Sequence, residues 1–429
     1  MTTTTDPSLR TPPGARFVVL ADDLTSAAEA AGHLADTGRA ASVVLDLGDL
    51  PHTGDEAWPC VDLNSRSLPS AEAAGRHQRV TGRLLVRAGA DDGPVGIYKT
   101  MDSSLRGNWP AELAAVMRAC GRAVAVVAPA CPAYARHTVR GDQLADGIPV
   151  HQGPAGLDPV RPVTSPSVID PLVEEGISVI AVAPTHDELA TALSRALAES
   201  LAPPGDTAQL RALVVDAATT DDLNRIAAAV AGHQGDVVLC GSPGLWEAVV
   251  PTSPDRSRAP VPAPAADSRG RALVLVGSLH PTTREQLAHL RKDGVSVLVT
   301  ADLAAQSDPV GHLVRLLETQ TTVALTTPED READPTTAAR HLRDLTAMGA
   351  ACARALPGLG LVLSGGDTAR AVAAALGAPA IHAVGTIAPG ITLGTLTGPH
   401  PHPVISKAGG FGDPSSLIAA AGALTRSTT

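Results

Sequence analysis

The stretch FVVLADDLTSAAEAAG, residues 17–32, shows the pattern that decides the fold of this chain. An apolar run over 17–21 ends abruptly in two aspartates, Asp22 and Asp23, and an alanine-rich segment follows. A short apolar run bounded by polar residues indicates a buried strand, and the longer alanine-rich segment indicates a helix. The stretch therefore predicts a strand, a polar turn and a helix, with two acids at the carboxyl end of the strand.

The same order of strand, loop and helix recurs along the chain. Continuous Val, Ile and Leu runs separated by helical segments are typical of parallel strands covered on both faces. Residues 251–270, rich in Pro, Ser and Ala without periodicity, form the predicted linker. We expect an α/β fold with two α/β domains, 15–250 and 271–426, whose mainly parallel sheets are covered by helices, after a disordered tail over 1–14. The predicted strands are 17–21, 42–45, 95–98, 124–128, 178–182, 212–216, 237–240, 273–276, 295–299, 322–325 and 361–363, and helices are predicted at 282–292 and 336–355.

Composition narrows the class of function. The 429 residues suit two domains, and a formal net charge of -11 argues against nonspecific nucleic-acid binding. No apolar run reaches the roughly 20 residues that a membrane helix needs. The first residues lack the basic start and apolar stretch of a signal peptide. Five cysteines without a CxxC pair argue against a zinc or disulfide framework, and we expect a cytoplasmic protein.

Two interpretations of the acid pair stay open. Thr25 or Ser26 can cap the following helix, and the acids can serve the positive end of its dipole. Alternatively, Asp22 or Asp23 accepts the hydrogen bond or the proton of a substrate hydroxyl. A single acid would suffice for the helix, which favours the second interpretation.

Polar residues also follow the next strands. IYKTMDSSLRGNWP, residues 97–110, places Lys, Asp, Ser and Arg directly after a short strand, and Asn108 with Pro110 predicts a helix start. Lys and Arg beside hydroxyls suit an anionic ligand, although a surface turn with a salt bridge is the alternative. DLNSRSL at 62–68 is a weaker signal of the same kind. The segment 128–141 predicts an irregular binding loop, and we discount a Cys131–His137 nucleophile pair, because a lone Cys near a His arises readily by chance.

Three glycine turns mark the second half of the chain. They are VGSLHPTT at 276–283, LSGGDTAR at 363–370 and SKAGGFGD at 406–413. Backbone N–H groups at such strand-to-helix turns can cradle phosphate. One glycine turn is weak evidence, because turns need glycine for conformation alone. Three in one domain favour a nucleotide, although neither GxxxxGK[ST] nor a strand-borne GxGxxG is present.

Taken together and in order, these segments resemble the four-carbon acid sugar kinases over nearly the whole chain. LADDLTSA is similar to that family's ADD(L/F)TGA opening, DLNSRSL to its D-T-x-S-R element, and YKTMDSSLRGN to its KK-x-DSTLRGN signature. DPVRPVTSPSV, GSPGLWEAV, SGGDTARAV and KAGGFGD resemble its DP-x-x-PV-x-(D)S, GSAGLA, SGGET and KSGNFG elements.

The resemblance implies an N-terminal domain that binds a sugar acid and a C-terminal domain that binds ATP, with the active site in the cleft between them. It implies Mg²⁺ as the ATP-bound metal, with no protein metal ligand assigned, and leaves a homodimer open. No nucleic acid or membrane partner is expected. The implied catalytic residues are Asp22, Asp23, Lys99 and Asp102, with Asp23 favoured as the base; the substrate-binding residues are Arg66, Ser103 and Arg106; and the nucleotide-binding residues are Ser278, Gly365, Gly366, Asp367, Thr368 and Gly409.

Several residues depart from the family pattern. Ser26 stands where glycine is usual, Thr100 where a second lysine is common, and Asp142-Gln143 where many members have a histidine pair. Asp367 and Gly410 replace the commoner Glu and Asn. A same-fold kinase for another hydroxy acid in specialised metabolism, or a nucleotide-binding regulator without turnover, therefore stays open. The missing fingerprint disfavours an NAD-dependent dehydrogenase.

Overall fold

The opening stretch forms the predicted strand and helix, β1 (Arg16–Ala21) and α1 (Leu24–Asp36). The structure is a computed structural model. It describes residues 16–48, 50, 57–86, 95–158, 161–183, 186–202, 209–251, 270–329 and 335–425. The predicted tail over 1–14 and all but the end residues of the predicted linker over 251–270 lie outside them.

The chain divides into two compact units. The first comprises Met1–Ala30 and Leu47–Pro254, and the second comprises Ala31–Asp46 and Asp255–Thr429. The predicted domains differ from these units in one segment, Ala31–Asp46, which lies with the second unit.

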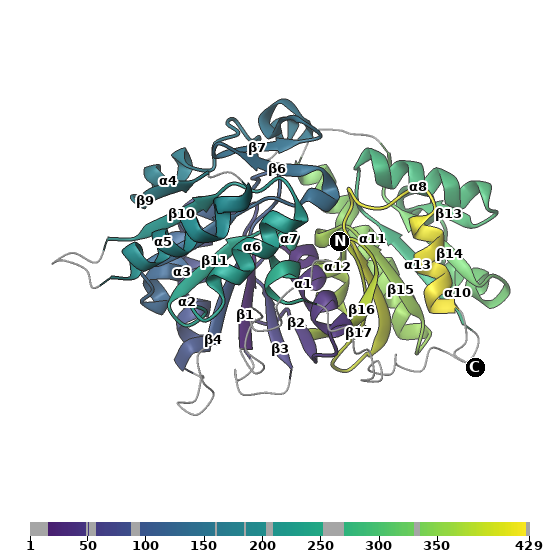
Figure 1. Cartoon of the computed structure of the whole chain (residues 1–429). Coiled ribbons are helices and arrows are strands. Elements are labelled where there is room, and N and C mark those ends of the chain that lie inside the picture. The colour runs from purple at the N-terminus through teal and green to yellow at the C-terminus, as the bar shows by residue number, and fades with distance from the viewer. Residues whose placement is uncertain are drawn as a thin grey trace, which may run out of the picture. The chain divides into compact units, whose positions relative to one another are not determined.

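The first unit contains a parallel sheet in the order β3-β1-β4-β11-β5-β10-β9. Its central strands are buried along their whole length, as the continuous apolar runs predicted. Helix α2 packs against α3, and α6 packs against both α5 and α7 (Figure 1). The remaining strands are β3 (Trp58–Asp62), β4 (Val95–Thr100), β5 (Val124–Ala128), β9 (Ser178–Val182), β10 (Arg211–Val215) and β11 (Val237–Gly241). The helices are α2 (Ser70–Val86), α3 (Trp109–Cys120), α4 (Asp170–Glu174), α5 (Leu189–Leu201), α6 (Thr220–Val230) and α7 (Pro243–Val249), with short 3₁₀ turns η2 (Pro132–Tyr134), η3 (Val150–Gln152), η4 (Pro154–Leu157) and η5 (His186–Glu188).

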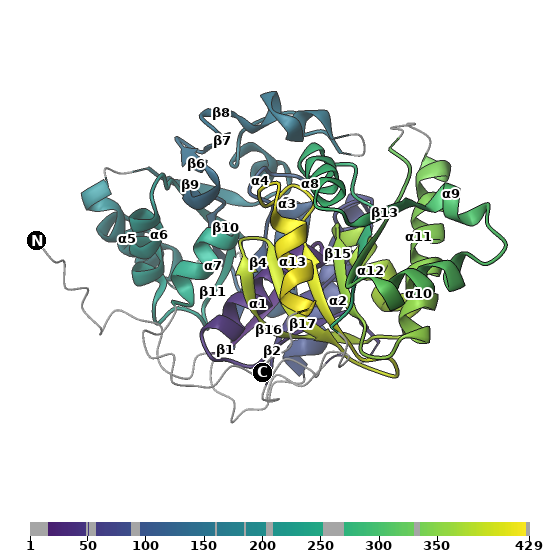
Figure 2. The ribbon, with the colours of Figure 1, turned by 90° about the vertical axis from the view of Figure 1, so that its right-hand side faces the viewer.

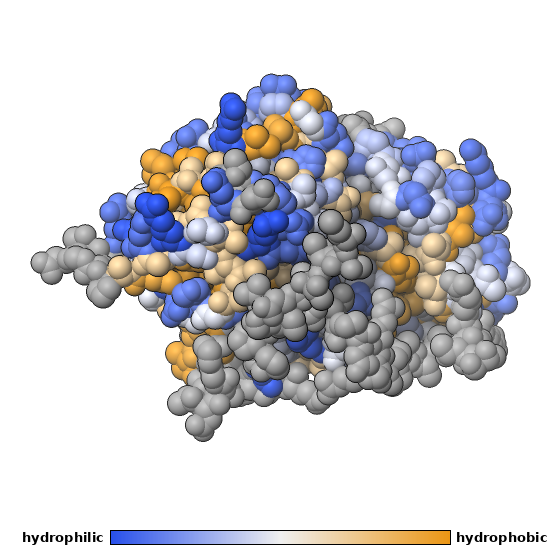
Figure 3. All heavy atoms as spheres, viewed as in Figure 1, coloured by the Kyte–Doolittle hydropathy of each residue, from blue (hydrophilic) through white to orange (hydrophobic). Residues whose placement is uncertain are grey.

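The predicted irregular loop over 128–141 is more ordered than expected. It leads into a small antiparallel sheet of β6 (Arg136–Val139), β7 (Asp142–Ala145) and β8 (Ile148–Pro149). Backbone bonds between Thr138 and Ala217 fasten this sheet to the end of β10. Figure 3 shows apolar patches in the regions of β7 and of α4. The exposed large apolar side chains include Val139 of β6, Ile148 of β8 and Val173 of α4. Such scattered apolar side chains are ordinary on a folded surface.

The second unit contains a mixed sheet in the order β13-β14-β12-β15-β18-β17-β16-β2. The first five strands are parallel, and β17, β16 and β2 (Ala41–Val44) add antiparallel pairs. In Figure 2, α13 lies in yellow in front of this sheet, where it contacts α8, β12 and β15. The other strands are β12 (Ala272–Val276), β13 (Ser296–Val299), β14 (Thr322–Thr326), β15 (Gly360–Ser364), β16 (Ala380–Ala388), β17 (Ile391–Leu396) and β18 (His402–Lys407). The helices are α8 (Pro281–Lys292), α9 (Thr300–Ala304), α10 (Pro309–Thr319), α11 (Pro335–Ala355), α12 (Gly366–Ala375) and α13 (Ser416–Thr425).

Specific contacts hold the early segment in the second unit. Val44, Val43 and Ser42 of β2 pair with Ala380, Ile381 and His382 of β16, and Ser42 Oγ lies 2.7 Å from His382 Nδ1. At the end of α1, the Asp36 carboxylate accepts a hydrogen bond from the Thr386 amide at 3.1 Å. The sequence separation of these partners explains why local patterns assigned the segment to the first domain.

Within the described ranges, no helix combines the length and apolar character needed to cross a membrane.

Candidate active site

The two acids after β1 occupy different environments. The Asp22 side chain is 2% exposed, whereas the Asp23 side chain is 20% exposed. Asp23 Oδ1 accepts a hydrogen bond from the Ser26 amide at 2.9 Å, and Oδ2 accepts one from Thr25 Oγ1 at 2.7 Å. Asp23 therefore caps α1, and the prediction that Thr25 or Ser26 does so is wrong, because the helix already begins at Leu24.

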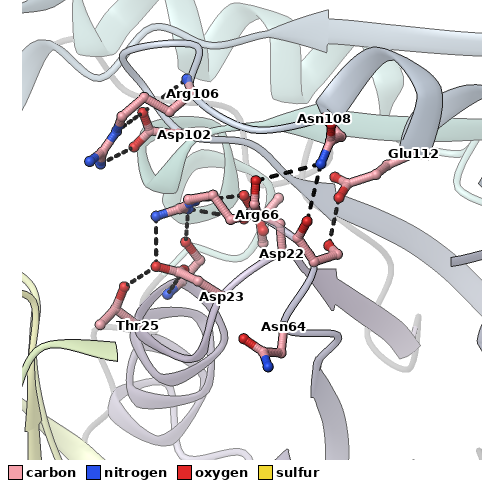
Figure 4. A network of polar contacts seen from close by, with 12 residues as sticks. Asp22, Asp23, Thr25, Asn64, Arg66, Asp102, Arg106, Asn108 and Glu112 are labelled. Atoms are coloured by element: carbon pink, nitrogen blue, oxygen red, sulfur yellow. Dashed lines mark hydrogen bonds and ion pairs between the residues drawn. The ribbon is translucent and has the colours of Figure 1, made fainter. Parts of the chain in front are cut away.

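Arg66, from the loop after β3, binds both acids (Figure 4). Its Nε and Nη2 donate to Asp22 at 2.7 and 3.0 Å, and its Nη1 donates to Asp23 Oδ2 at 2.7 Å. One planar guanidinium thus offsets the repulsion between two adjacent carboxylates. The structure brings together three residues that are predicted from two separate motifs.

The same contacts shift the pKa values of the two acids in opposite directions. Burial raises the pKa of Asp22 above its ordinary value, although Arg66 and Lys99 act in the opposite direction. Burial would also raise the pKa of Asp23, but Arg66 and the hydrogen bonds from Ser26 and Thr25 outweigh it, so the pKa of Asp23 is lowered. Asp23, whose pKa is lowered, is also the acid of the pair that reaches solvent.

The segment after β4 forms a tight polar turn beside this pair. Arg106 donates to Asp102 through Nε and Nη2, both at 2.9 Å, and the Asp102 carboxylate also accepts from the Arg106 amide at 3.2 Å. Against the effect of burial, Arg106 holds the pKa of Asp102 well below its usual range. Gly107 has φ +91°, and a Cβ there would lie 3.1 Å from Asp22 Oδ2. Glycine at this position therefore lets the turn pack against the acid pair.

Ser103 and Lys99 from the same motif lie differently. Ser103 is half-buried, and its carbonyl accepts a hydrogen bond from Gln143 Nε2 at 2.8 Å. Lys99 is fully buried, with its Nζ 2.9 Å from Glu112 Oε2. Lys99 is therefore not presented as an open cation at the strand end, as its position in the motif suggested.

Glu112 of α3 is a buried residue that the sequence patterns do not single out. Its Oε1 accepts a hydrogen bond from Ser65 Oγ at 2.5 Å, next to Arg66 in the chain. Burial raises the pKa of Glu112, but Lys99, His77 and Ser65 together outweigh this effect and lower the pKa to about 2. A lone acid inside the apolar helix sequence AELAAVM is the one available signal for this role.

Asn108 begins α3 as predicted, but its side chain makes no cap hydrogen bond. Instead, Asn108 Nδ2 donates to the carbonyls of Ser65 and Leu68 at 3.1 and 2.9 Å, with a longer contact to Arg66 at 3.5 Å. The predicted cap is thus a clamp that fixes the loop carrying Arg66.

Cys131 is 2% exposed, and burial raises its pKa to about 12, so the thiolate that a nucleophile needs is disfavoured. His137 lies on β6. These observations agree with discounting the pair as a nucleophilic site.

In the second unit, two of the predicted glycine turns meet at Ser278. Gly365 precedes α12 with φ +103°, and a Cβ there would lie 3.5 Å from Ser278 Cβ and from Thr368 Oγ1. A Cβ on Gly409 would lie 2.4 Å from Ser278 Oγ. Gly366, Asp367 and Thr368 form the first turn of α12, and the free amides of a helix start are groups that can bind an anion. The nucleotide residues predicted from three separate turns are therefore neighbours.

Thr283 is a further residue of this cluster that sequence reasoning missed. Its hydroxyl donates to the Gly409 carbonyl at 2.5 Å and lies 3.4 Å from Ser278 Oγ. A hydroxyl in the first turn of a predicted helix, after Pro281, is too common to be a signal by itself.

Comparisons with known proteins agree with this division of sites. A protein-family model described as a sugar-binding N-terminal domain matches residues 17–249, and a second family model described as a nucleotide-binding C-terminal domain matches residues 273–417. A solved structure from Salmonella typhimurium LT2 has the same fold, with a TM-score of 0.72 at 21% identity over 94% of this chain and 98% of that one.

Proteins with similar sequences are named as sugar-acid kinases. The chain is 30% identical to a D-threonate kinase of Salmonella typhimurium, over 94% of this chain and 96% of that protein. It is 33% identical to a D-threonate kinase of Bordetella bronchiseptica, over 95% and 96%. A D-erythronate kinase of Heliobacterium modesticaldum is 28% identical, over 92% and 94%. With a sugar-binding and a nucleotide-binding domain in series and full-length similarity to these enzymes, the chain belongs to the four-carbon acid sugar kinase family.

Proposed function

We propose that this protein transfers the γ-phosphoryl group of ATP to a hydroxyl group of a four-carbon sugar acid, with D-threonate as the first substrate to test. The observation that carries the proposal is the acid pair bound by Arg66 in the unit matched by the sugar-binding model, with one ionised acid reaching solvent. Phosphoryl transfer needs positioning and charge stabilisation rather than covalent chemistry, and this arrangement suits that need.

Asp23 is the proposed partner of the acceptor hydroxyl. Its lowered pKa keeps it ionised at neutral pH, so it can accept the hydroxyl hydrogen bond, orient the attacking oxygen and take its proton as the bond to phosphorus forms. Asp22 is more deeply buried and acts by holding Arg66. We therefore keep Asp23 as the base and assign Asp22 to positioning.

The sugar-acid carboxylate is assigned to the Arg106 side of the site. Arg106 is 37% exposed, and its guanidinium can bind a carboxylate bidentately, with the Ser103 hydroxyl nearby in the turn. Asp102 holds Arg106 in place, and Arg66 contributes positive charge beside Asp23. Lys99 acts through the effect of its charge on Glu112 and Asp22 rather than by contact with the substrate.

The nucleotide is assigned to Ser278, Gly365, Gly366, Asp367, Thr368 and Gly409. The residues fit a polyphosphate, because the glycines leave no Cβ between the backbone amides and a ligand at a helix start. When bound with ATP, Mg²⁺ neutralises phosphate charge. Among the described residues no group of three His, Cys, Asp or Glu side chains is set to hold a metal. Mg²⁺ is usually held by phosphates and waters with one or two carboxylates, and Asp367 in the first turn of α12 is the carboxylate that we propose for it.

Three further statements stay predictions. One is that the bound sugar acid and the bound ATP come together at a shared active site during turnover. Five free cysteines suit a reducing cytoplasm. A homodimer is tested by light scattering of the purified protein.

The substrate specificity rests on residues that depart from the family pattern. Gln143 is buried, with bonds to Thr138 Oγ1 and to the carbonyls of Ser103 and Pro129, so it supports the Ser103 turn. Ser26 Oγ lies 3.5 Å from Arg66 Nη2. Both changes touch the proposed sugar-acid side and leave room for another hydroxy acid.

Purified protein with ATP, Mg²⁺ and a panel of D-threonate, D-erythronate and oxo-tetronates, followed by ADP release, tests the proposal. ADP release that depends on one four-carbon acid is the expected outcome. Turnover only with a different hydroxy acid would reassign the substrate. Tight ATP binding without turnover on any acid would favour a nucleotide-binding regulator.

A further inference from the structure

The protein buries two of its three lysines completely, and they differ in their partners. Lys99 Nζ lies 2.9 Å from the Glu112 carboxylate, which raises the pKa of Lys99 against the effect of burial. Lys407 makes no ion pair with any of the described residues, and its Nζ donates to the Ala408 carbonyl at 2.9 Å. Burial alone lowers the pKa of Lys407 to about 8. Removing an ammonium group from water without a counter-charge costs several kcal/mol. A bound anion would therefore stabilise the charged form of Lys407.

The sheet register shows where that anion would lie. Lys407 ends β18 and is in register with Ser364 of β15, which is in register with Val276 of β12. Registered residues on parallel strands face the same side of the sheet, so Lys407 and Ser364 share the face of Val276, against which α8 and α13 pack. Ser364 Oγ is buried and has no hydrogen-bond partner. A buried ammonium without a counter-charge and a buried hydroxyl without a hydrogen-bond partner therefore lie at adjacent strand ends on one face.

Hydrogen bonds join the start of α8, the 407–413 segment and the turn before α12. Thr283 in the first turn of α8 donates to the Gly409 carbonyl at 2.5 Å, and Gln286 Nε2 donates to the carbonyls of Phe411 and Asp413 at 3.0 and 2.9 Å. Gly365 N, just before α12, donates to the Lys407 carbonyl at 2.9 Å. The glycine turns that the proposed function assigns to the nucleotide are thus bonded directly to the Lys407 segment.

We propose that Lys407, assisted by the Ser364 hydroxyl, is a buried subsite for one phosphate group of the bound nucleotide. The ammonium exchanges the Ala408 carbonyl for a phosphate oxygen, and Ser364 Oγ donates to the same group. The inference rests on the proposed kinase function, because it takes the nucleotide as the source of the phosphate. A purely structural role for Lys407 needs no charge, since methionine would fill the same apolar volume without the cost of burying an ion.

The test compares Lys407→Met with Lys292→Met, an exposed lysine at the end of α8. ATP, ADP and inorganic phosphate binding are measured by calorimetry with Mg²⁺, alongside thermal unfolding without ligand. Lys407→Met is expected to weaken ATP and ADP binding at least 30-fold and to unfold at or above the wild-type temperature, while Lys292→Met binds as wild type. Ser364→Ala is expected to weaken binding about threefold.

ATP affinity in Lys407→Met within twofold of wild type would overturn the proposal, as would a loss confined to inorganic phosphate. If Lys407→Met unfolds at a lower temperature, Lys407→Arg decides: ATP affinity within fivefold of wild type supports the charge, and a 30-fold loss there overturns it. Wild-type protein that binds ATP through Lys407 but phosphorylates no acid would reject the kinase proposal alone. Turnover with nucleotide affinity independent of Lys407 would reject the subsite alone.

Discussion

Adjacent residues of one type can have opposite tasks when the backbone turns between them. Asp22 points into the protein and receives two Arg66 hydrogen bonds, whereas Asp23 caps α1 and keeps contact with solvent. That both acids lie in a polar turn at the end of a buried strand could be predicted from the sequence. Which acid capped the helix could not, because a shift of one residue in the helix start exchanges the roles.

Asp23→Asn is expected to lower turnover by roughly 10²–10⁴-fold, while ATP affinity stays near that of wild type. Asn caps helices as well as Asp does, so the hydrogen bond from the Ser26 amide and the stability of α1 should persist. The measurement is steady-state ADP release together with ATP calorimetry and thermal unfolding.

Asp22→Asn serves as the comparison, because it removes a buried charge from Arg66 and should lower the unfolding temperature as well. Loss of ATP binding in Asp23→Asn would place the acid pair on the nucleotide side of the reaction and contradict the assignment.

Lys407 gives a pH signature of stability. Its folded pKa of about 8 lies below the ordinary value of 10.5, so the charge opposes folding fully below pH 8 and ceases to do so above pH 10.5. Without ligand, Lys407→Met should therefore be more stable than wild type near pH 7, by roughly 3 kcal/mol at most.

Denaturant unfolding of both proteins from pH 7 to 10.5 measures this difference, which should shrink steadily above pH 8. A difference that is constant across this range would mean that Lys407 has the same pKa in the folded and the unfolded protein, so that its burial has no effect on its protonation.

Helix α3 positions residues of the proposed sugar-acid site. Asn108 at its start clamps the loop that carries Arg66, and Glu112 one turn later joins that loop to Lys99 of β4. Asn108 and Pro110 predicted where the helix starts. The sequence could not predict these contacts, because their partners lie more than ten residues away and depend on how α3 packs against β4 and the 63–68 loop.

Glu112→Leu alone should destabilise the protein by about 3–5 kcal/mol, because it leaves the Lys99 ammonium buried without a partner. The double variant Lys99→Met with Glu112→Leu removes both charges and should recover most of that loss. Denaturant unfolding of the two single variants and the double variant measures the coupling.

Additive effects of the two substitutions would contradict a mutually dependent pair. Sugar-acid affinity in the double variant adds a second readout, since the Ser65 hydroxyl would still lose its acceptor on Glu112.

Strands were predictable where they are buried on both faces, because such strands have continuous apolar sequences, as in Val124–Ala128. The antiparallel strands β16 and β17 escaped prediction. Their sequences, AIHAVGTIA and ITLGTL, mix small, polar and glycine residues, and their burial alternates along the strand. Alternating half-buried strands of this composition lack the signal on which the parallel strands were recognised.

At the scale of the whole molecule, the two units are not two consecutive pieces of chain. Ala31–Asp46 belongs to the second unit, although more than 200 residues of the first unit follow it. Sequence patterns could place a boundary near the Pro-rich segment, but a short strand such as ASVV carries no information about a partner in the other half.

A fragment of residues 270–425 should therefore fold poorly by itself, because it leaves the β16 edge that pairs with β2 open to aggregation. The same fragment preceded by residues 31–46 on a flexible linker should be recovered as a monomer that unfolds cooperatively and binds ATP. Size-exclusion chromatography, thermal unfolding and calorimetry compare the two. Cooperative unfolding and full ATP affinity in the shorter fragment would show that the early segment is dispensable.

The pairing of β2 with β16 also sets an order of events while the chain is being made. At roughly 5–20 residues per second, the roughly 340 residues between Val44 and Ala380 take about 17–70 s to synthesise. Throughout that interval Val43 and Val44 have no strand from the second unit beside them. The nascent chain thus carries β2 without its β16 partner on the ribosome, and we expect the need for chaperone protection to fall only when residues 380–388 emerge.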